Sequence, residues 1–188
     1  MTIIDCKSGK VMPWTAIQLA AYSLLDVPVD FTEEGHRYTH NGDPLESVTG
    51  ILRAEGFIDT AFYTEYGRQR GSFVHLARHY DDIGCLDEST IDPEIAPYLE
   101  AWRRFKRESG FVVERSEVPM ASSAYRYAGK PDVIGHFPSG CLKRAAVELH
   151  DDDTYKLVPF TDRQDGNIWL SALAVYQWKH NTLKRRAA

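Results

Sequence analysis

The sequence predicts an α/β (α+β) domain in which helices flank a mixed β-sheet. A length of 188 residues suits a single domain, and a content of 43% hydrophobic and 26% charged residues is typical of a globular chain. Before residue 110, several segments repeat apolar residues at helical spacing, whereas residues 111–160 mostly alternate apolar and polar residues as strands do. We therefore expect residues 1–188 to form one domain that combines both kinds of element.

The N-terminal segment is predicted to form a strand, a helix and a hairpin. Residues 3–7 resemble a short strand that ends at Ser8-Gly9, and Pro13 suits the first turn of a helix over residues 14–25. Asn41-Gly42 is a strong tight-turn signal and predicts a hairpin that begins at Phe31 and continues to the segment before Val48. A second helix is expected near Gly50, with either Ser47 or Thr49 as its cap.

Two long helices are predicted next, followed by strands and a final helix. The first covers residues 61–80 with Phe73, Leu76, Ala77 and Tyr80 on one side, and the second covers residues 93–109 and ends at Gly110. The apolar side of such a helix normally faces the core, and the aromatic residues of both helices are expected there rather than as platforms on which bases stack. The remaining expected elements are strands over 111–119 and 125–137, a hairpin made of 145–150 and 155–160, and an amphipathic helix over 165–179.

Composition excludes several classes of protein. The three cysteines (Cys6, Cys85 and Cys141) form no Cys-x-x-Cys pair, so we expect neither a disulfide framework nor a four-cysteine zinc or iron–sulfur site. No apolar run approaches the ~20 residues of a membrane span, and the charged N-terminal segment does not resemble a secretory signal. We therefore expect a cytoplasmic protein without a membrane partner. The net charge of −5 means that any binding of nucleic acid has to use local basic patches or a metal ion.

One set of residues has the equipment for metal-assisted hydrolysis. Asp5 and Lys7 are two positions apart on a predicted strand, so their side chains point to the same face. If Asp132 lies on a neighbouring strand, two carboxylates and one ammonium converge on one place. Two carboxylates can bind a hard divalent cation, and the lysine can orient a water molecule or stabilise charge on a phosphate.

These residues belong to a set of short motifs that together resemble the PD-(D/E)XK nuclease superfamily, in particular the RecB-like exonucleases and their phage-encoded relatives. The resemblance covers most of the chain and implies a restriction-endonuclease-like sheet flanked by helices. The motifs are Ile4-Asp-Cys-Lys-Ser-Gly9, Gln18-Leu-Ala-Ala-Tyr22, Arg70-Gly-Ser-Phe-Val-His75, Ser116-Glu117-Val-Pro and Tyr127-Ala-Gly-Lys-Pro-Asp-Val-Ile-Gly135.

The resemblance also implies a role for each residue of the motifs. It implies an Mg²⁺ or Mn²⁺ ion, since imidazole together with carboxylates suits Mn²⁺ as well as Mg²⁺. It further implies a DNA substrate. The implied metal ligands are His75, Asp132 and Asp5, the catalytic lysine is Lys7, the auxiliary acid at the edge is Glu117, and the DNA contacts are Gln18, Tyr22 and Arg70.

The order of the motifs differs from that of the family. The (D/E)-x-K strand and the Gln-x-x-x-Tyr helix normally follow the Pro-Asp strand, but here they come first, within residues 1–25. We interpret residues 1–25 as a relocated strand–helix cassette, residues 29–110 as a hairpin with helices, and residues 111–180 as the sheet core with the final helix. The cassette is expected to dock into its own chain or, failing that, into a second copy as a segment-swapped homodimer.

An alternative in the usual order exists. Glu148-Leu149-His150 follows Asp132 at the distance expected for a (D/E)-x-K motif, with histidine in place of lysine. We favour Asp5 and Lys7 because that segment keeps the lysine. The resulting hypothesis is a divalent-metal-dependent DNA nuclease, an exonuclease of the kind used in phage recombination and DNA processing. The alternatives are a catalytically inactive DNA-binding or assembly protein on the same scaffold and, less favoured, an enzyme of unrelated chemistry.

Overall fold

A computed structural model of the chain describes residues 1–59 and 64–187, with side chains described as far as residue 180. Within these residues the strands form a five-stranded sheet of order β11-β10-β1-β9-β6 and a six-stranded sheet of order β2-β7-β8-β5-β4-β3. The α+β class predicted from the sequence is therefore confirmed. The strands of the first sheet are β1 (Thr2–Lys7), β6 (Val112–Ser116), β9 (Val133–His136), β10 (Arg144–Leu149) and β11 (Tyr155–Pro159).

Strand β1 lies in the middle of the five-stranded sheet. It pairs in parallel with β10, where Asp5 is opposite Ala146 and Lys7 is opposite Glu148. On its other side it pairs antiparallel with β9, where Ile4 is opposite Val133. The N-terminal strand thus docks between two strands of its own chain, and the sheet is completed without a second copy.

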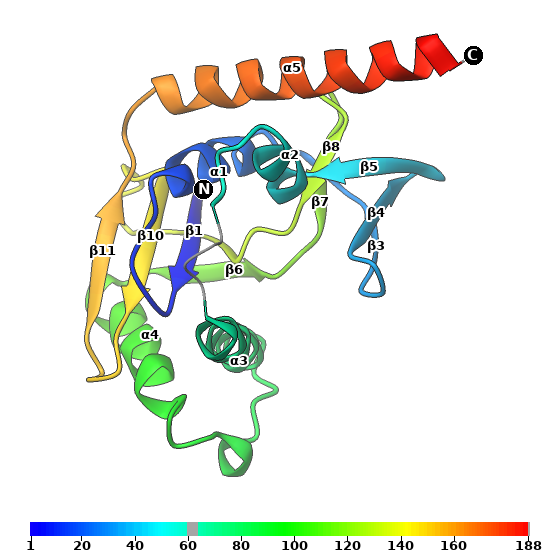
Figure 1. Ribbon diagram of the computed structural model, residues 1–188. Helices are drawn as coiled ribbons and strands as arrows, with labels where there is room; N and C mark the ends of the chain where they lie inside the picture. The colour runs from blue at the N-terminus through cyan, green and yellow to red at the C-terminus, as the bar shows by residue number, and fades with distance from the viewer. Residues whose placement is uncertain (60–63, 188) are drawn as a thin grey trace.

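Helices cover both faces of this sheet (Figure 1). The helices α1 (Trp14–Tyr22), α2 (Val48–Ala54) and α5 (Gln164–Ala187) lie on one side, and α3 (Glu65–Asp82) and α4 (Ala96–Ser109) lie on the other. The alternation of β1 distributes its apolar side chains between two cores. Ile3 packs in the core that contains Trp169 of α5, whereas Ile4 and Cys6 pack in the core that contains Trp102 of α4.

The second sheet contains one more turn than the sequence predicts. Its strands are β2 (Val27–Pro28), β3 (Asp30–Thr32), β4 (Arg37–His40), β5 (Asp43–Ser47), β7 (Met120–Ser122) and β8 (Tyr127–Gly129). Asn41-Gly42 joins β4 to β5, as predicted. The expected single strand from Phe31 to Tyr38 is wrong, because Gly35 and His36 adopt positive φ values and reverse the chain between β3 and β4.

The expected strand over residues 125–137 is also divided. Its first part forms β8 in one sheet and its last part forms β9 in the other. The segment Lys130-Pro131-Asp132 between them belongs to neither sheet. Proline lacks the N–H that a central strand needs, so the ladder is interrupted at Pro131. This break places Asp132 immediately before β9, at the junction of the two sheets.

The helices form where the sequence predicts them, but some of them begin or end at other residues than predicted. Ser47, not Thr49, caps α2 by accepting a hydrogen bond from the Gly50 N–H, and Gly110 ends α4 with a φ of 67°. Helix α1 ends at Tyr22 rather than at residue 25. Helix α3 begins at Glu65, and the predicted start at residue 61 lies outside the described residues.

Helix α3 is oriented differently from the sequence prediction. Phe73, Leu76 and Tyr80 were expected to face the core, but they are 50%, 48% and 41% exposed. The buried residues of the helix are Val74 and Arg78. The helix instead turns polar side chains inward, where they meet the acidic residues around Asp132. Among the described residues, no helix is long and apolar enough to cross a membrane.

Candidate functional site

The site begins with Asp5 and Lys7 on β1. Their side chains point to the same face of the sheet, and Lys7 Nζ lies 3.0 Å from Asp5 Oδ2. Asp5 is almost completely buried, whereas the Lys7 side chain is 28% exposed and reaches a groove on the surface. The strand therefore supplies a buried carboxylate and a partly exposed ammonium held beside it, as the spacing predicts.

Asp132 meets β1 from the position immediately before the neighbouring strand β9. Its Oδ2 accepts a hydrogen bond of 2.7 Å from the backbone N–H of Cys6, the residue between Asp5 and Lys7. These two bonded residues are 126 positions apart along the chain, yet the pairing of β1 with β9 brings them into contact. The predicted meeting of the N-terminal strand with the Pro-Asp segment is thus present in the folded chain.

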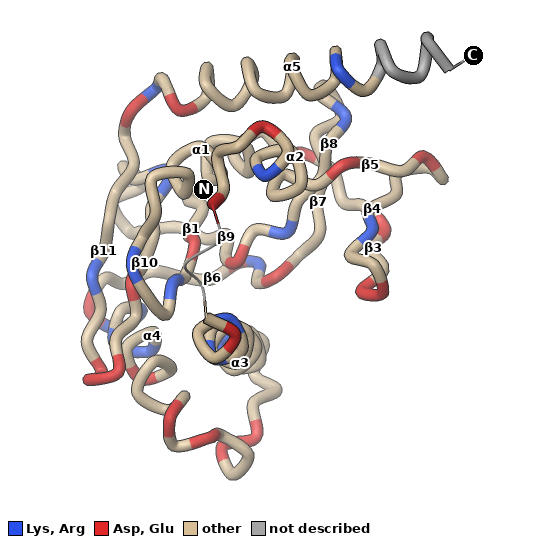
Figure 2. Tube along the Cα trace, in the orientation of Figure 1, with Lys and Arg blue, Asp and Glu red and all other residues tan. Residues whose placement is uncertain are grey.

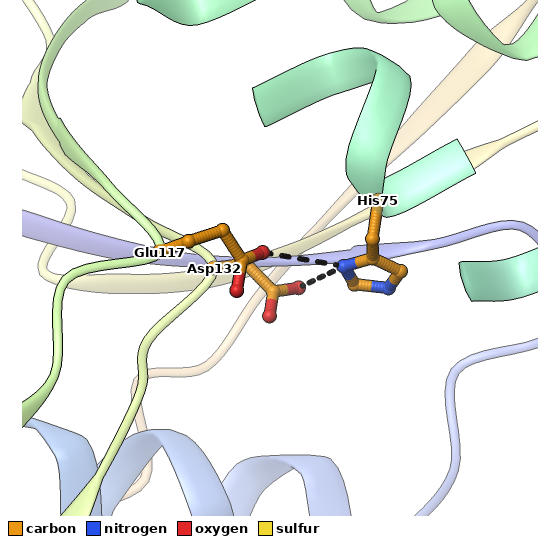
Figure 3. A group of neighbouring side chains, drawn as sticks. All are labelled: His75, Glu117 and Asp132. Atoms are coloured by element: carbon orange, nitrogen blue, oxygen red, sulfur yellow. Dashed lines mark ion pairs between the residues drawn. The ribbon is translucent and has the colours of Figure 1, made fainter. Parts of the chain in front are cut away.

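Helix α3 brings His75 to the same place (Figure 3). His75 Nδ1 lies 3.5 Å from Asp132 Oδ2 and 3.6 Å from Glu117 Oε1. One ligand atom from each of these three residues lies within 4.8 Å of the other two, a spacing that fits a single metal ion. An imidazole with two carboxylates is a donor set that Mn²⁺ or Mg²⁺ accepts once water completes the shell.

This triad differs from the ligand set that the resemblance implies. Glu117, expected at the edge of the site, belongs to the cluster, whereas Asp5 lies behind it and is paired with Lys7. Glu117 reaches the cluster because its backbone adopts a φ of 54°, a conformation uncommon for residues other than glycine, and its N–H bonds the Asp132 carbonyl. The backbone thus holds Glu117 and Asp132 side by side.

Arg78 organises the site and was not singled out from the sequence. Its guanidinium is fully buried, and its Nη2 donates to Glu117 Oε1 at 2.7 Å and to the Asp132 carbonyl at 3.2 Å. Its Nη1 donates to Asp82 Oδ2 at 2.9 Å. The available signal was helical spacing, because His75, Arg78 and Asp82 occupy positions i, i+3 and i+7 and so share one face of α3.

Burial and charge move the pKa values of the acidic groups in opposite directions. Burial, reinforced by the charge of Asp132, raises the pKa of Asp5 to about 6, although the Lys7 ammonium opposes the change. Burial also acts on Asp132, but His75, Lys7 and Arg78 together lower its pKa below the ordinary value. The Asp132 carboxylate therefore stays ionised to a lower pH than the Asp5 carboxylate does. The ionised form of Asp5 is compensated by the ammonium of Lys7.

The imidazole of His75 responds to the same carboxylates. Burial of the ring disfavours its protonation, yet the charge of Asp132 and the hydrogen bond to Glu117 outweigh this effect and raise the pKa of His75. A metal ion would replace that proton on Nδ1, because both are held by the same two carboxylates. The ring nitrogen is thus directed at the two carboxylates that would share a cation with it.

A surface groove of about 1180 Å³ opens above the triad. His75 lines it with two acidic residues, Glu33 and Glu117, and the lining is completed on its charged side by five basic residues: Lys7, Lys10, Arg68, Arg70 and Lys130. The chain has a net charge of −5, and Figure 2 shows basic and acidic positions interspersed along it, so this basic lining is a local feature. A groove of this kind attracts a polyanion although the whole protein is acidic.

Of the three predicted DNA contacts, one lies in the groove and two are buried outside it. Arg70 lines the groove, where its Nη2 donates to the Ser8 carbonyl at 3.1 Å. Gln18 and Tyr22 are buried, and Gln18 Nε2 donates to Tyr22 Oη at 2.9 Å. They do not line the groove. Burial raises the pKa of Tyr22, and the nearby charges of Asp132 and Asp5 add to the effect.

The alternative motif is engaged elsewhere. Glu148 is directly opposite Lys7 in the sheet register, but its Oε1 accepts a hydrogen bond from the Val11 N–H at 2.7 Å and its Oε2 lies 3.3 Å from Lys156 Nζ. His150 Nδ1 lies 3.0 Å from Thr154 Oγ1, in the adjoining turn. Glu148 therefore anchors the segment after β1, which supports the choice of Asp5 and Lys7.

Comparison of the chain with known protein families, with curated proteins and with solved structures finds no match. The chemistry of the site therefore follows from its own geometry: a three-ligand cluster, a lysine beside a buried carboxylate, and a basic groove above them.

Proposed function

We propose that the protein is a divalent-metal-dependent DNA nuclease. The observation that carries the proposal is the convergence of Lys7, His75, Glu117 and Asp132 at a groove whose lining is basic. A metal cluster alone would suit many reactions, and a basic groove alone would suit simple binding. Together they suit hydrolysis of a phosphodiester, which needs a bound polyanion and a place to stabilise additional negative charge.

Each group has a distinct task in this proposal. His75, Glu117 and Asp132 would hold the cation, which when bound polarises the phosphate and makes a water molecule more acidic. Lys7 Nζ, held by Asp5, directs its positive charge at the groove, where it stabilises charge that builds on the phosphate. Arg78 holds the Glu117 carboxylate in place, and the basic residues of the groove bind the neighbouring phosphates.

The finer assignment rests on the sequence resemblance. His75 and the Gln18–Tyr22 pair resemble the RecB-like branch, which favours an exonuclease that processes DNA in the cytoplasm of a bacterial or phage-infected cell. The direct test is degradation of linear duplex and single-stranded DNA with Mn²⁺ or Mg²⁺. We expect degradation by the wild-type chain and a loss of at least about 100-fold in rate in Asp132→Asn and in Lys7→Ala.

The matched control is Asp43→Asn, which removes a carboxylate that is 65% exposed on β5. This variant should degrade DNA at the wild-type rate. Titration with Mn²⁺ provides a second measurement, because His75→Ala should weaken metal binding whether or not DNA is cut. Retention of DNA without metal and without degradation would favour the inactive DNA-binding alternative. Absence of any affinity for DNA would contradict both readings.

A further inference from the structure

The groove has an apolar wall in addition to its basic lining. Leu76 and Tyr80 project from α3, are 48% and 41% exposed, and line the groove. Phe31 of β3 also lines it, and Lys130 Nζ lies 5.3 Å from the centre of the Phe31 ring. One exposed ring (Tyr80), one partly buried ring (Phe31) and an aliphatic side chain (Leu76) thus share one groove with the cations that would bind phosphates.

This combination selects one form of nucleic acid. In a duplex the flat faces of the bases are stacked on each other, so a protein reaches only the backbone and the base edges. In a single strand each base offers a flat face, and aromatic side chains stack on it without regard to sequence. A groove built for duplex DNA would gain nothing from exposing Leu76 and Tyr80 in its lining, because burial of apolar side chains requires an apolar partner.

We propose that the groove binds single-stranded DNA, with one or more unstacked bases against Tyr80 and Phe31 and the backbone along the basic residues that lead to Lys7. This inference rests on the proposed nuclease function, because it names the strand that is presented to the metal cluster. The basic lining complements the phosphates, and the apolar wall complements the bases.

Direct binding tests the inference. Labelled oligo(dT) of about 16 nucleotides, the upper end of single-strand site sizes, and the matching dT/dA duplex are titrated in EDTA at one salt concentration, with fluorescence anisotropy as the readout. We expect the single strand to bind more tightly than the duplex. Tyr80→Ala should weaken single-strand binding by roughly 5- to 150-fold, the effect of removing one stacked base, and leave duplex binding unchanged.

Two variants on the same helix serve as controls. Phe73→Ala removes a ring that is 50% exposed but does not line the groove, and it should bind the single strand as the wild type does. Tyr80→Phe keeps a ring at position 80 and should retain most of the affinity. Thermal unfolding of each variant verifies that the fold is intact.

The outcomes separate this inference from the proposed function. Equal or tighter binding of the duplex, or equal losses in Phe73→Ala and Tyr80→Ala, would overturn the inference. Metal-dependent degradation that is confined to duplex DNA would leave the nuclease proposal standing and reject the single-strand groove. Selective single-strand binding that depends on Tyr80, without degradation in Mn²⁺ or Mg²⁺, would reject the nuclease and retain the groove.

Discussion

Replacement of Asp5 by asparagine should stabilise the fold at neutral pH while it disables the site. Burial raises the pKa of Asp5 from its ordinary value of 3.8 to about 6. The folded chain therefore holds a proton on Asp5 more tightly than the unfolded chain does. The stability that this group contributes is complete below about pH 4 and is lost as the pH rises through 6.

The expected magnitude follows from that difference. A change of about two pH units in the pKa corresponds to about 3 kcal/mol of free energy of unfolding. The asparagine side chain cannot ionise, so Asp5→Asn should exceed the wild type in stability by up to about 3 kcal/mol at pH 8. This corresponds to a rise in melting temperature of roughly 6 to 12 °C for a chain of this size. At pH 4 the advantage should vanish.

The assay is urea unfolding in EDTA from pH 4 to pH 8, followed by tryptophan fluorescence. The change with pH in the difference between variant and wild type reports the ionisation of Asp5 together with the charges of Lys7, Asp132 and His75 that act on it, while distant titrating groups cancel because they are common to both proteins. Asp43→Asn, which replaces an exposed carboxylate on β5, is the control for the substitution itself. A stability difference for Asp5→Asn that is constant from pH 4 to pH 8, or a less stable variant at pH 8, would refute the reasoning.

Further predictions concern the supports of the site. Arg78→Met should lower the free energy of unfolding by about 3–5 kcal/mol because it leaves buried carboxylates without their cation. Arg68→Met on the same helix removes an exposed ion pair and should lower it by only about 0–1 kcal/mol. Equal losses of the two variants in denaturant unfolding would contradict the central role of Arg78. Glu148→Gln should keep metal-dependent DNA degradation within a few-fold of wild type, and its abolition in a nuclease assay would favour the alternative motif. Gly129→Ala should destabilise the fold by about 1–3 kcal/mol, measured by thermal unfolding, since the added Cβ would lie 2.6 Å from the Tyr22 ring; a neutral result would show that the ring can move.

The sequence predicted the local features well, because their causes lie within a few residues. Gly110 ends α4 with the positive φ that its position requires, and Ser47 caps α2 through its own side chain. Asn41-Gly42 turns the chain between β4 and β5. By contrast, the turn at Gly35 and His36 was missed, because the residues on either side of it continue a strand-like pattern.

The orientation of α3 shows where local patterns stop being sufficient. Its helical period was evident, but Leu76 and Tyr80 looked like the core face, and they are exposed. Arg78 lies inward because its Nη1 and Nη2 donate to Asp82, Glu117 and the Asp132 carbonyl, and two of these partners belong to distant segments. A buried charge is tolerated only when such partners are present, and their positions cannot be read from the helix itself.

By itself, the sequence determined that Asp5 and Lys7 share one face of a strand, since side chains alternate with a period of two residues. The break at Pro131 also has a local cause, since proline has no N–H to donate, but the alternating pattern of residues 125–137 predicted one continuous strand. Only the tertiary structure decided that β1 lies between β9 and β10 and that Glu117, rather than Asp5, joins His75 and Asp132. The reason is physical: strand pairing and charge compensation are contacts between distant segments, and they exist only once the chain has folded.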